Sequence, residues 1–270
     1  MDEGSIEAEP KRPWRFRSTV AIVAVVVMAF VAGTSLIGIA HQITWWAQSP
    51  EPTLTYMGSA REPARRSSSL NNLKQIGLGL HNYADDHDKT FPAGSTMSSW
   101  GRLEHGWQAA LLPYVEEKPL YEKIDFEHPW NHPINQEAYK TPIALFINPH
   151  ASGPEVDNRG YPFSDYSANV RVLRPARPMP VAEITDGTAK TILAGEAVSN
   201  RKPWAAPGNW RDPAAGINVP GGFGGPWKSR GANFLFADGH VSFLSEDIDP
   251  KVLRTLATPA DGDRVGDGVP

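Results

Sequence analysis

The hydrophobic positions of the chain form three patterns that predict different elements. The stretch 19–40 contains no charged residue, and at about 1.5 Å rise per residue a helix of this length could cross a hydrocarbon layer of about 30 Å. Between residues 70 and 83, apolar residues recur every three or four positions, which predicts one apolar face of a helix. Between residues 234 and 243, apolar residues alternate around Asp238-Gly239, which predicts a β-hairpin.

The charges beside the first apolar stretch predict its orientation. Four basic residues precede it, Lys11, Arg12, Arg15 and Arg17, and no basic residue follows until Arg61. The positive-inside rule then leaves the N-terminus in the cytoplasm. We therefore expect a single-pass anchor in the inner (cytoplasmic) membrane and a periplasmic or otherwise extracytoplasmic domain. A cleaved secretory signal is the alternative, since residues 38–40 offer small side chains, although the apolar stretch exceeds the usual h-region of about 7 to 15 residues.

The same patterns divide the chain into segments. We expect a cytoplasmic segment at 1–18, a transmembrane helix with its interface at 19–46, a proline-rich linker at 47–63, a domain at 64–257 and a disordered polar tail at 258–270. The expected fold class is α+β, with the domain's N-terminal helix packed on an antiparallel sheet that ends in the predicted hairpin, and with long loops between the elements.

The domain's first helix should begin near Ala60, because Ser59 and Glu62 have capping-box spacing, and it should end by residue 88. Gly77 and Gly79 each cost such a helix about 1 kcal/mol relative to alanine. Tertiary packing must therefore hold this helix, and the glycines predict a close neighbour on its surface.

The predicted hairpin assigns Asp238-Gly239 a structural role as its turn. A two-residue type I′ loop needs positive φ at both central residues, which Asp-Gly provides. That loop pairs Phe236 with Val241 and Phe234 with Phe243, and it places these four side chains on one core-facing side of the sheet. We therefore interpret Asp238 and Gly239 as a structural turn and not as catalytic residues.

Composition narrows the classes of function. The chain has no cysteine, so disulfides and thiolate chemistry are excluded. The formal net charge is −4 and the basic residues are scattered, which argues against a nucleic-acid partner. The chain has 24 glycines, 25 prolines and 9 tryptophans, which predicts a domain rich in irregular loops.

Candidate chemistry is sparse, and we expect no enzyme, metal or cofactor. The acidic stretch 85–88 lacks EF-hand spacing and reads as a solvated helix end. His128 and His132 have the i, i+4 spacing of zinc ligands, but a proline follows each of them. Glu196 follows an apolar strand, where a structural salt bridge is favoured over a general base. A hydrolase using Glu196, Asp186 and a histidine ranks last among the functional readings.

The loop from residue 203 to 231 is too rich in glycine and proline for regular structure. It carries four aromatic residues, Trp204, Trp210, Phe223 and Trp227, which form a candidate interaction surface for a glycan or a partner protein. The alternative is that these rings fold back and cover the domain's own core.

Four stretches resemble, in order, blocks of the bacterial family called domain of unknown function 1559. They are "NNLKQIGLGLHNY" (71–83), "GWQAALLPYVEEKPLY" (106–121), "ITDGTAKTILAGE" (184–196) and "GANFLFADGHVSFL" (231–244). Members of this family resemble type IV pilins and the pseudopilins of type II secretion-like systems, and they carry a C-terminal H-x9-DG signature. The resemblance implies an exported structural or secretion/envelope-associated subunit whose partners are the membrane and either itself or secretion-system and envelope proteins.

The chain also departs from this family's pattern. "RPWRFRST" stands before the apolar stretch, in place of the prepilin signal G-F-T-L-x-E. The signature histidine would fall at Lys228, and a typical cysteine is replaced by Asn148. These departures leave open whether the chain is processed and assembled as a pilin.

Overall fold

The computed structural model describes residues 22–29, 53–227 and 230–260, with the backbone alone at 53–63. The chain divides into two compact units, residues 1–61 and 62–270. In the first unit a helix covers residues 22–29, and its side chains are exposed. Within the described ranges no helix combines the length and apolar character needed to cross a membrane. The remainder of the predicted anchor at 19–46 and most of the predicted tail lie outside the described residues.

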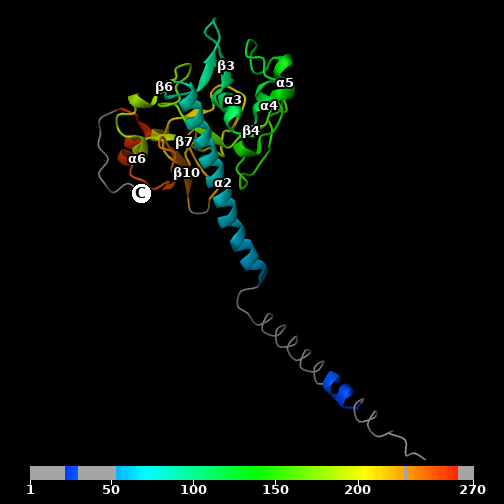
Figure 1. The fold of residues 1–270 in the computed structure, drawn as a ribbon. Coiled ribbons are helices and arrows are strands. Elements are labelled where there is room, and N and C mark those ends of the chain that lie inside the picture. The colour runs from blue at the N-terminus through cyan, green and yellow to red at the C-terminus, as the bar shows by residue number, and fades with distance from the viewer. Residues whose placement is uncertain (1–21, 30–52, 228–229, 261–270) are drawn as a thin grey trace, which may run out of the picture. The chain divides into compact units, whose positions relative to one another are not determined.

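The second unit mixes short helices with antiparallel strands, which confirms the α+β class (Figure 1). Its helices are α2 (Thr53–Asp86, which begins in the first unit), α3 (Trp107–Leu111), α4 (Lys118–Tyr121), α5 (Gln136–Tyr139) and α6 (Pro250–Ala257). Its strands are β1 (Thr90–Phe91), β2 (Ser95–Met97), β3 (Leu103–Gly106), β4 (Phe163–Ser164), β5 (Tyr166–Asn169), β6 (Met179–Pro180), β7 (Ile192–Glu196), β8 (Lys202–Pro203), β9 (Trp210–Arg211), β10 (Gly231–Phe236) and β11 (Val241–Ser245).

The central sheet has five strands in the order β11-β10-β7-β5-β9. Neighbouring strands are antiparallel except β5 and β9, which run parallel. Three further pairs, β1-β6, β2-β3 and β4-β8, form small separate ribbons. Each position on a central strand therefore faces one of two layers, and both layers are filled by buried side chains.

Helix α2 covers one layer of the sheet with the predicted apolar face. Leu73, Ile76 and Leu80 are fully buried in one cluster with Leu235 of β10. A Cβ atom on Gly77 would lie 2.7 Å from a methyl group of Leu235, so the glycine allows a close approach of helix and strand, as predicted.

The predicted start of this helix is wrong. The helix already includes Thr53, and Pro63 lies inside it. The capping-box spacing of Ser59 and Glu62 did not mark a start, because serine and glutamate are also tolerated in helix interiors. The C-terminal end at Asp86 lies within the predicted limit.

The hairpin forms where predicted, but its register differs by one residue. Leu235 pairs with Val241, and Phe236 N–H donates to the carbonyl oxygen of His240 at 2.9 Å. The loop thus has three residues, and only its third, Gly239, has positive φ, at 94°. The expected type I′ turn and the expected common face of four side chains are therefore wrong. Both faces of β10 are buried, so alternation of polarity could not select the register.

The second layer of the sheet is covered by α6, an element the sequence reading missed. Leu253 and Leu256 of α6 pack with Phe234 and Phe236 of β10 in a separate buried cluster. Asp249 caps this helix, because its carboxylate accepts a hydrogen bond from Lys251 N–H at 2.7 Å. The sheet ends in the hairpin, as predicted, and α6 follows it.

The loop after β8 is more regular than expected, because β9 extends the central sheet as its parallel edge strand. The Arg211 guanidinium is buried and donates hydrogen bonds to the carbonyl oxygens of Ser199, Asn200 and Gly222. One buried side chain therefore ties the segment before β8 and the middle of the loop to the sheet edge. The prediction of a wholly irregular segment is wrong at this strand.

Gly239→Ala should lower the free energy of unfolding by about 1–2 kcal/mol, because a Cβ atom is strained at the positive φ of this turn. Gly239→Asn should cost less, since asparagine tolerates the left-handed region better than alanine. Urea unfolding of the full chain, followed by tryptophan fluorescence, measures both variants. An alanine variant as stable as the unmodified chain would contradict this account of the turn.

Candidate functional site

A fully buried carboxylate, Glu196 at the end of β7, lies at the centre of a cluster of buried polar groups. Its Oε1 accepts hydrogen bonds from Ser69 Oγ at 2.5 Å, Asn148 Nδ2 at 3.0 Å and Asn233 Nδ2 at 3.0 Å. Its Oε2 accepts from Trp227 Nε1 at 2.6 Å and from Asn233 N–H at 2.8 Å. We call these five residues the Glu196 network.

The network connects elements that are far apart in the sequence. Ser69 belongs to α2, Asn233 to β10 and Trp227 to the long loop after β9, whereas Asn148 precedes β4. The hydroxyl group of Tyr166 on β5 extends the network through a hydrogen bond to Ser69 Oγ at 3.0 Å. The helix, the sheet and the loop therefore share one set of buried hydrogen bonds.

The electrostatics of Glu196 differ from the expected salt bridge. In the described part of the chain no lysine or arginine forms an ion pair with it, and all of its donors are neutral groups. Burial raises the pKa of Glu196 above its ordinary value, and the hydrogen bonds from Asn233, Ser69 and Trp227 oppose that rise. The interpretation of Glu196 as one half of a structural ion pair is therefore wrong.

A buried ion pair lies beside the network. Arg201 donates to Asp165 at 3.2 Å, and Asn148 N–H donates to the other oxygen of Asp165 at 2.9 Å. Burial raises the pKa of Asp165, and Arg201 opposes this. Asn148 thus joins the two buried carboxylates: its side-chain amide donates to Glu196, and its backbone N–H donates to Asp165. Glu196 itself is 0% exposed, so its carboxylate has no surface on which to meet a substrate.

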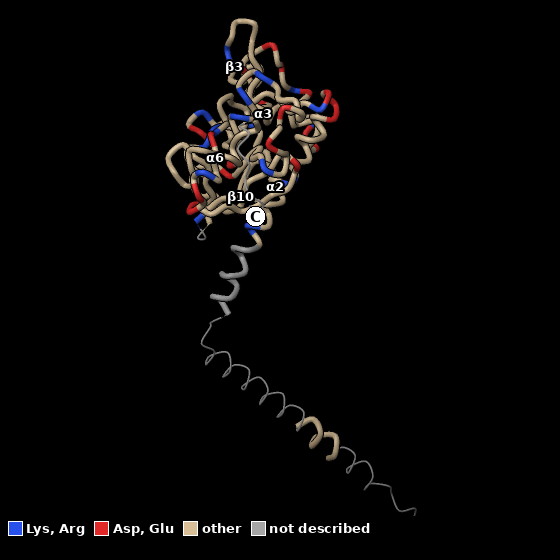
Figure 2. The backbone as a smooth tube through the Cα atoms, turned by 90° about the vertical axis from the view of Figure 1, so that its left-hand side faces the viewer, with Lys and Arg blue, Asp and Glu red and all other residues tan. Residues whose placement is uncertain are grey.

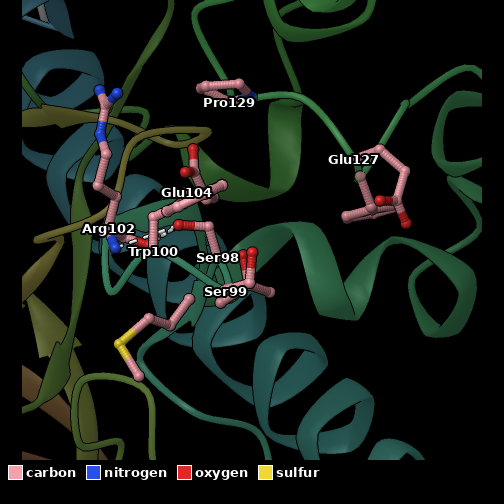
Figure 3. A pocket seen from close by; sticks show the side chains of 10 residues that line it. Ser98, Ser99, Trp100, Arg102, Glu104, Glu127 and Pro129 are labelled. Atoms are coloured by element: carbon pink, nitrogen blue, oxygen red, sulfur yellow. Dashed lines mark hydrogen bonds between the residues drawn. The ribbon is translucent and has the colours of Figure 1, made fainter.

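An accessible candidate site among the described residues is a pocket beside the β2–β3 hairpin (Figure 3). We call it the hairpin pocket. Its volume is about 570 Å³, and it is lined by Thr96, Met97, Ser98, Ser99, Trp100, Arg102, Glu104, Phe126, Glu127 and Pro129. The Trp100 side chain is 87% exposed, whereas Glu104 is only 9% exposed. The sequence reading missed this site, although a tryptophan between serines and a glycine is a signal for an aromatic side chain presented on a turn.

The aromatic residues proposed as an interaction surface are placed differently. Trp204 and Phe223 are fully buried, Trp227 is 5% exposed, and Trp210 packs against the core. Trp204 Nε1–H donates to the carbonyl oxygen of Thr141 at 3.1 Å. The alternative reading therefore holds, and the candidate interaction surface is corrected: these rings fill the core, where large apolar surface is most stable.

The remaining candidates form no metal centre among the described residues. His128 and His132 have ring centroids 4.3 Å apart, and His128 Nδ1 lies 3.0 Å from an oxygen of Asp125. Asp85 pairs with Lys89 at the end of α2. Within the described ranges no group of three or more histidine, aspartate or glutamate side chains is arranged to hold a metal ion.

Asp238 of the predicted turn and Asp186 lie in different connections of the fold. Asp238 Oδ1 accepts from His240 N–H at 3.0 Å in the hairpin loop. Asp186 lies in the connection before β7, and Glu196 is buried at that strand's other end. A hydrolase built on Asp186 and Glu196 would need these two acids close together. They lie toward opposite ends of β7, so the strand separates them.

These observations define an α+β domain with a long N-terminal helix on a mainly antiparallel sheet and a buried carboxylate network between them. The chain matches the family model described as "Protein of unknown function (DUF1559)" over residues 58–224. The match covers more than half of the chain, so the chain belongs to this family, as its sequence blocks predicted. Searches of curated proteins and of solved structures gave no match.

Proposed function

We propose that this protein is a membrane-anchored, pilin- or pseudopilin-like extracytoplasmic subunit that acts through protein contacts in an envelope or secretion assembly. The observation that carries the proposal is the order of elements at the start of the chain. The apolar stretch 19–40 is followed by α2, whose C-terminal half packs on an antiparallel sheet. This order is the one that the family resemblance implies for an anchored pilin-like subunit.

A structural role is also supported by the chemistry of the described residues. The carboxylate with the most hydrogen bonds, Glu196, is saturated by internal donors and closed to solvent. Basic and acidic positions are interspersed over the domain in Figure 2, which gives no large field of one sign to gather a charged substrate. We therefore propose a non-enzymatic protein.

The placement of the domain is tested with a reporter. Alkaline phosphatase fused after residue 270 should be active in a bacterial host, because the domain is proposed to lie outside the cytoplasm, and the fusion should remain in the membrane fraction. A matched fusion that lacks residues 1–46 should be inactive and soluble. An inactive full-length fusion would contradict the placement, and an active fusion that is released from the membrane would favour the cleaved secretory signal.

The assembly role is tested separately by crosslinking in intact cells. We expect the full chain to be captured with copies of itself or with envelope and secretion proteins, which mass spectrometry identifies. Recovery of the uncrosslinked monomer alone, at natural expression levels, would contradict an assembly subunit without affecting the placement.

A further inference from the structure

We propose that the hairpin pocket is a saccharide-binding site. A neutral sugar ring stacks on Trp100, and its hydroxyl groups form hydrogen bonds with the polar side chains that line the pocket. This site is independent of the anchor and of the assembly role. It is also distinct from the candidate surface at residues 203–231, whose aromatic rings are largely buried.

The first argument is the presentation of Trp100. Its side chain is 87% exposed, although an indole is among the side chains that gain most from burial. The turn that carries it is ordered: Ser98 N–H donates to the carbonyl oxygen of Arg102 at 2.8 Å, and Gly101 N–H donates to that of Ser98 at 3.0 Å. A flat ring on an ordered turn offers apolar contact to a ligand with little loss of conformational entropy.

The second argument is the unpaired acid within the pocket. Glu104 is 9% exposed, and among the described residues no hydrogen bond or ion pair is made by its carboxylate. Neither of its carboxylate oxygens is among the buried polar atoms that lack a partner, so the carboxylate opens to the pocket and is free to accept hydrogen bonds from a bound partner. Figure 3 shows Glu104 near the hairpin tip and Pro129, with Glu127 across the opening. A ligand that carries hydroxyl donors would provide that partner.

The third argument is the balance of charge and apolar surface. Glu104, Glu127 and Arg102 sum to a formal charge of about −1, which favours a neutral ligand over a polycation or a polyanion. Carboxylates and a guanidinium are planar groups with two or more bonding atoms, which suits adjacent hydroxyl groups. Apolar Met97 and Phe126 lie in the same wall. Saccharides combine hydroxyl groups with apolar C–H faces, and the volume is within the range of about 300–1,000 Å³ for ligand pockets.

A protein partner fits this surface less well. The apolar side chains of the pocket are interrupted by charged ones, whereas the core of a protein interface is depleted in charge. The saccharide is therefore the occupant that the pocket favours, and binding of protein alone is an outcome that would overturn the proposal.

The test uses the purified full chain in a detergent without a sugar headgroup, so that the detergent cannot compete. An array of neutral, acidic and amino-bearing envelope oligosaccharides identifies the ligand, and calorimetry with the strongest neutral one measures its Kd. We expect binding of neutral oligosaccharides, a Kd at least about tenfold higher for Trp100→Ala and a Kd about fivefold higher for Glu104→Gln. Trp100→Phe should retain part of the affinity, because it keeps a flat ring.

The matched control is Leu78→Ala, which also truncates an exposed apolar side chain (61% exposed) but lies on α2, outside the pocket. Its Kd should equal that of the unmodified chain. Thermal unfolding of all variants shows whether the fold is intact, and Trp100→Ala should not change it. The proposal is overturned if no oligosaccharide binds, if only charged ones bind, or if binding survives both Trp100→Ala and Glu104→Gln.

Discussion

Glu196→Leu is expected to lower the free energy of unfolding by about 3–5 kcal/mol, the largest effect of a single side chain in the Glu196 network. Leucine removes an acceptor that serves Ser69, Asn148, Trp227 and Asn233. The donors of Trp227 and Asn233 are then left buried without an acceptor among the described residues, whereas Ser69 and Asn148 keep their bonds to Tyr166 and to each other. Glu196→Gln should also destabilise the domain, because its amide group would turn a donor toward other donors. Urea unfolding of the full chain measures both variants.

The matched control is Glu137→Gln, since the side chain of Glu137 is 87% exposed. It should change the free energy of unfolding by less than about 0.5 kcal/mol. If Glu196→Leu were as stable as this control, the network would not hold α2 and the loop to the sheet.

The stability of the same network should depend on pH. Because burial raises the pKa of Glu196, the folded state binds this proton more tightly than the unfolded state does. The contribution of Glu196 to stability is therefore full below its ordinary pKa of 4.5 and is lost as pH rises through the raised pKa. The stability difference between the unmodified chain and Glu196→Gln should accordingly be larger at acidic than at neutral pH.

Trp204→Ala is expected to cost about 3–5 kcal/mol of unfolding free energy, the range for removing a buried aromatic ring. Trp204 is fully buried, with ring centroids 5.1 Å from Tyr139 and 6.1 Å from Phe146. The variant also leaves the carbonyl oxygen of Thr141 without its indole donor. Thermal and urea unfolding of the full chain measure the loss.

Trp100→Ala is the matched control, because it makes the same substitution at a side chain that is 87% exposed. Its unfolding free energy should change by less than about 0.5 kcal/mol. A Trp204→Ala variant that kept full stability but no longer bound a glycan or partner protein would contradict this account. It would favour the loop aromatics as an interaction surface.

The fold was predictable wherever a pattern is local. The spacing of Leu73, Ile76 and Leu80 identified the buried face of α2, and Asp238-Gly239 located the hairpin. The register of that hairpin was not predictable, because both sides of β10 are buried and polarity cannot distinguish them. Helix α6 was missed although Asp249 and Pro250 form a start signal, since the pattern is only eight residues long.

The candidate site was predictable only in part. Glu196 was singled out from its position after an apolar strand, but its partners lie between 31 and 127 residues away in the sequence. The exposed indole of Trp100 and the buried ring of Trp204 look alike in a sequence, because burial depends on what the rest of the chain places around a residue.

By itself, the sequence determined the family, the α+β class, the absence of thiol chemistry and the faces of single elements, because each follows from composition or from spacing within one segment. Only the tertiary structure decided that Glu196 is satisfied by neutral donors, that the loop aromatics are core residues and that a pocket opens beside Trp100. The physical reason is that hydrogen-bond partners, burial and cavities are properties of segments brought together in space, and spacing along one segment does not specify them.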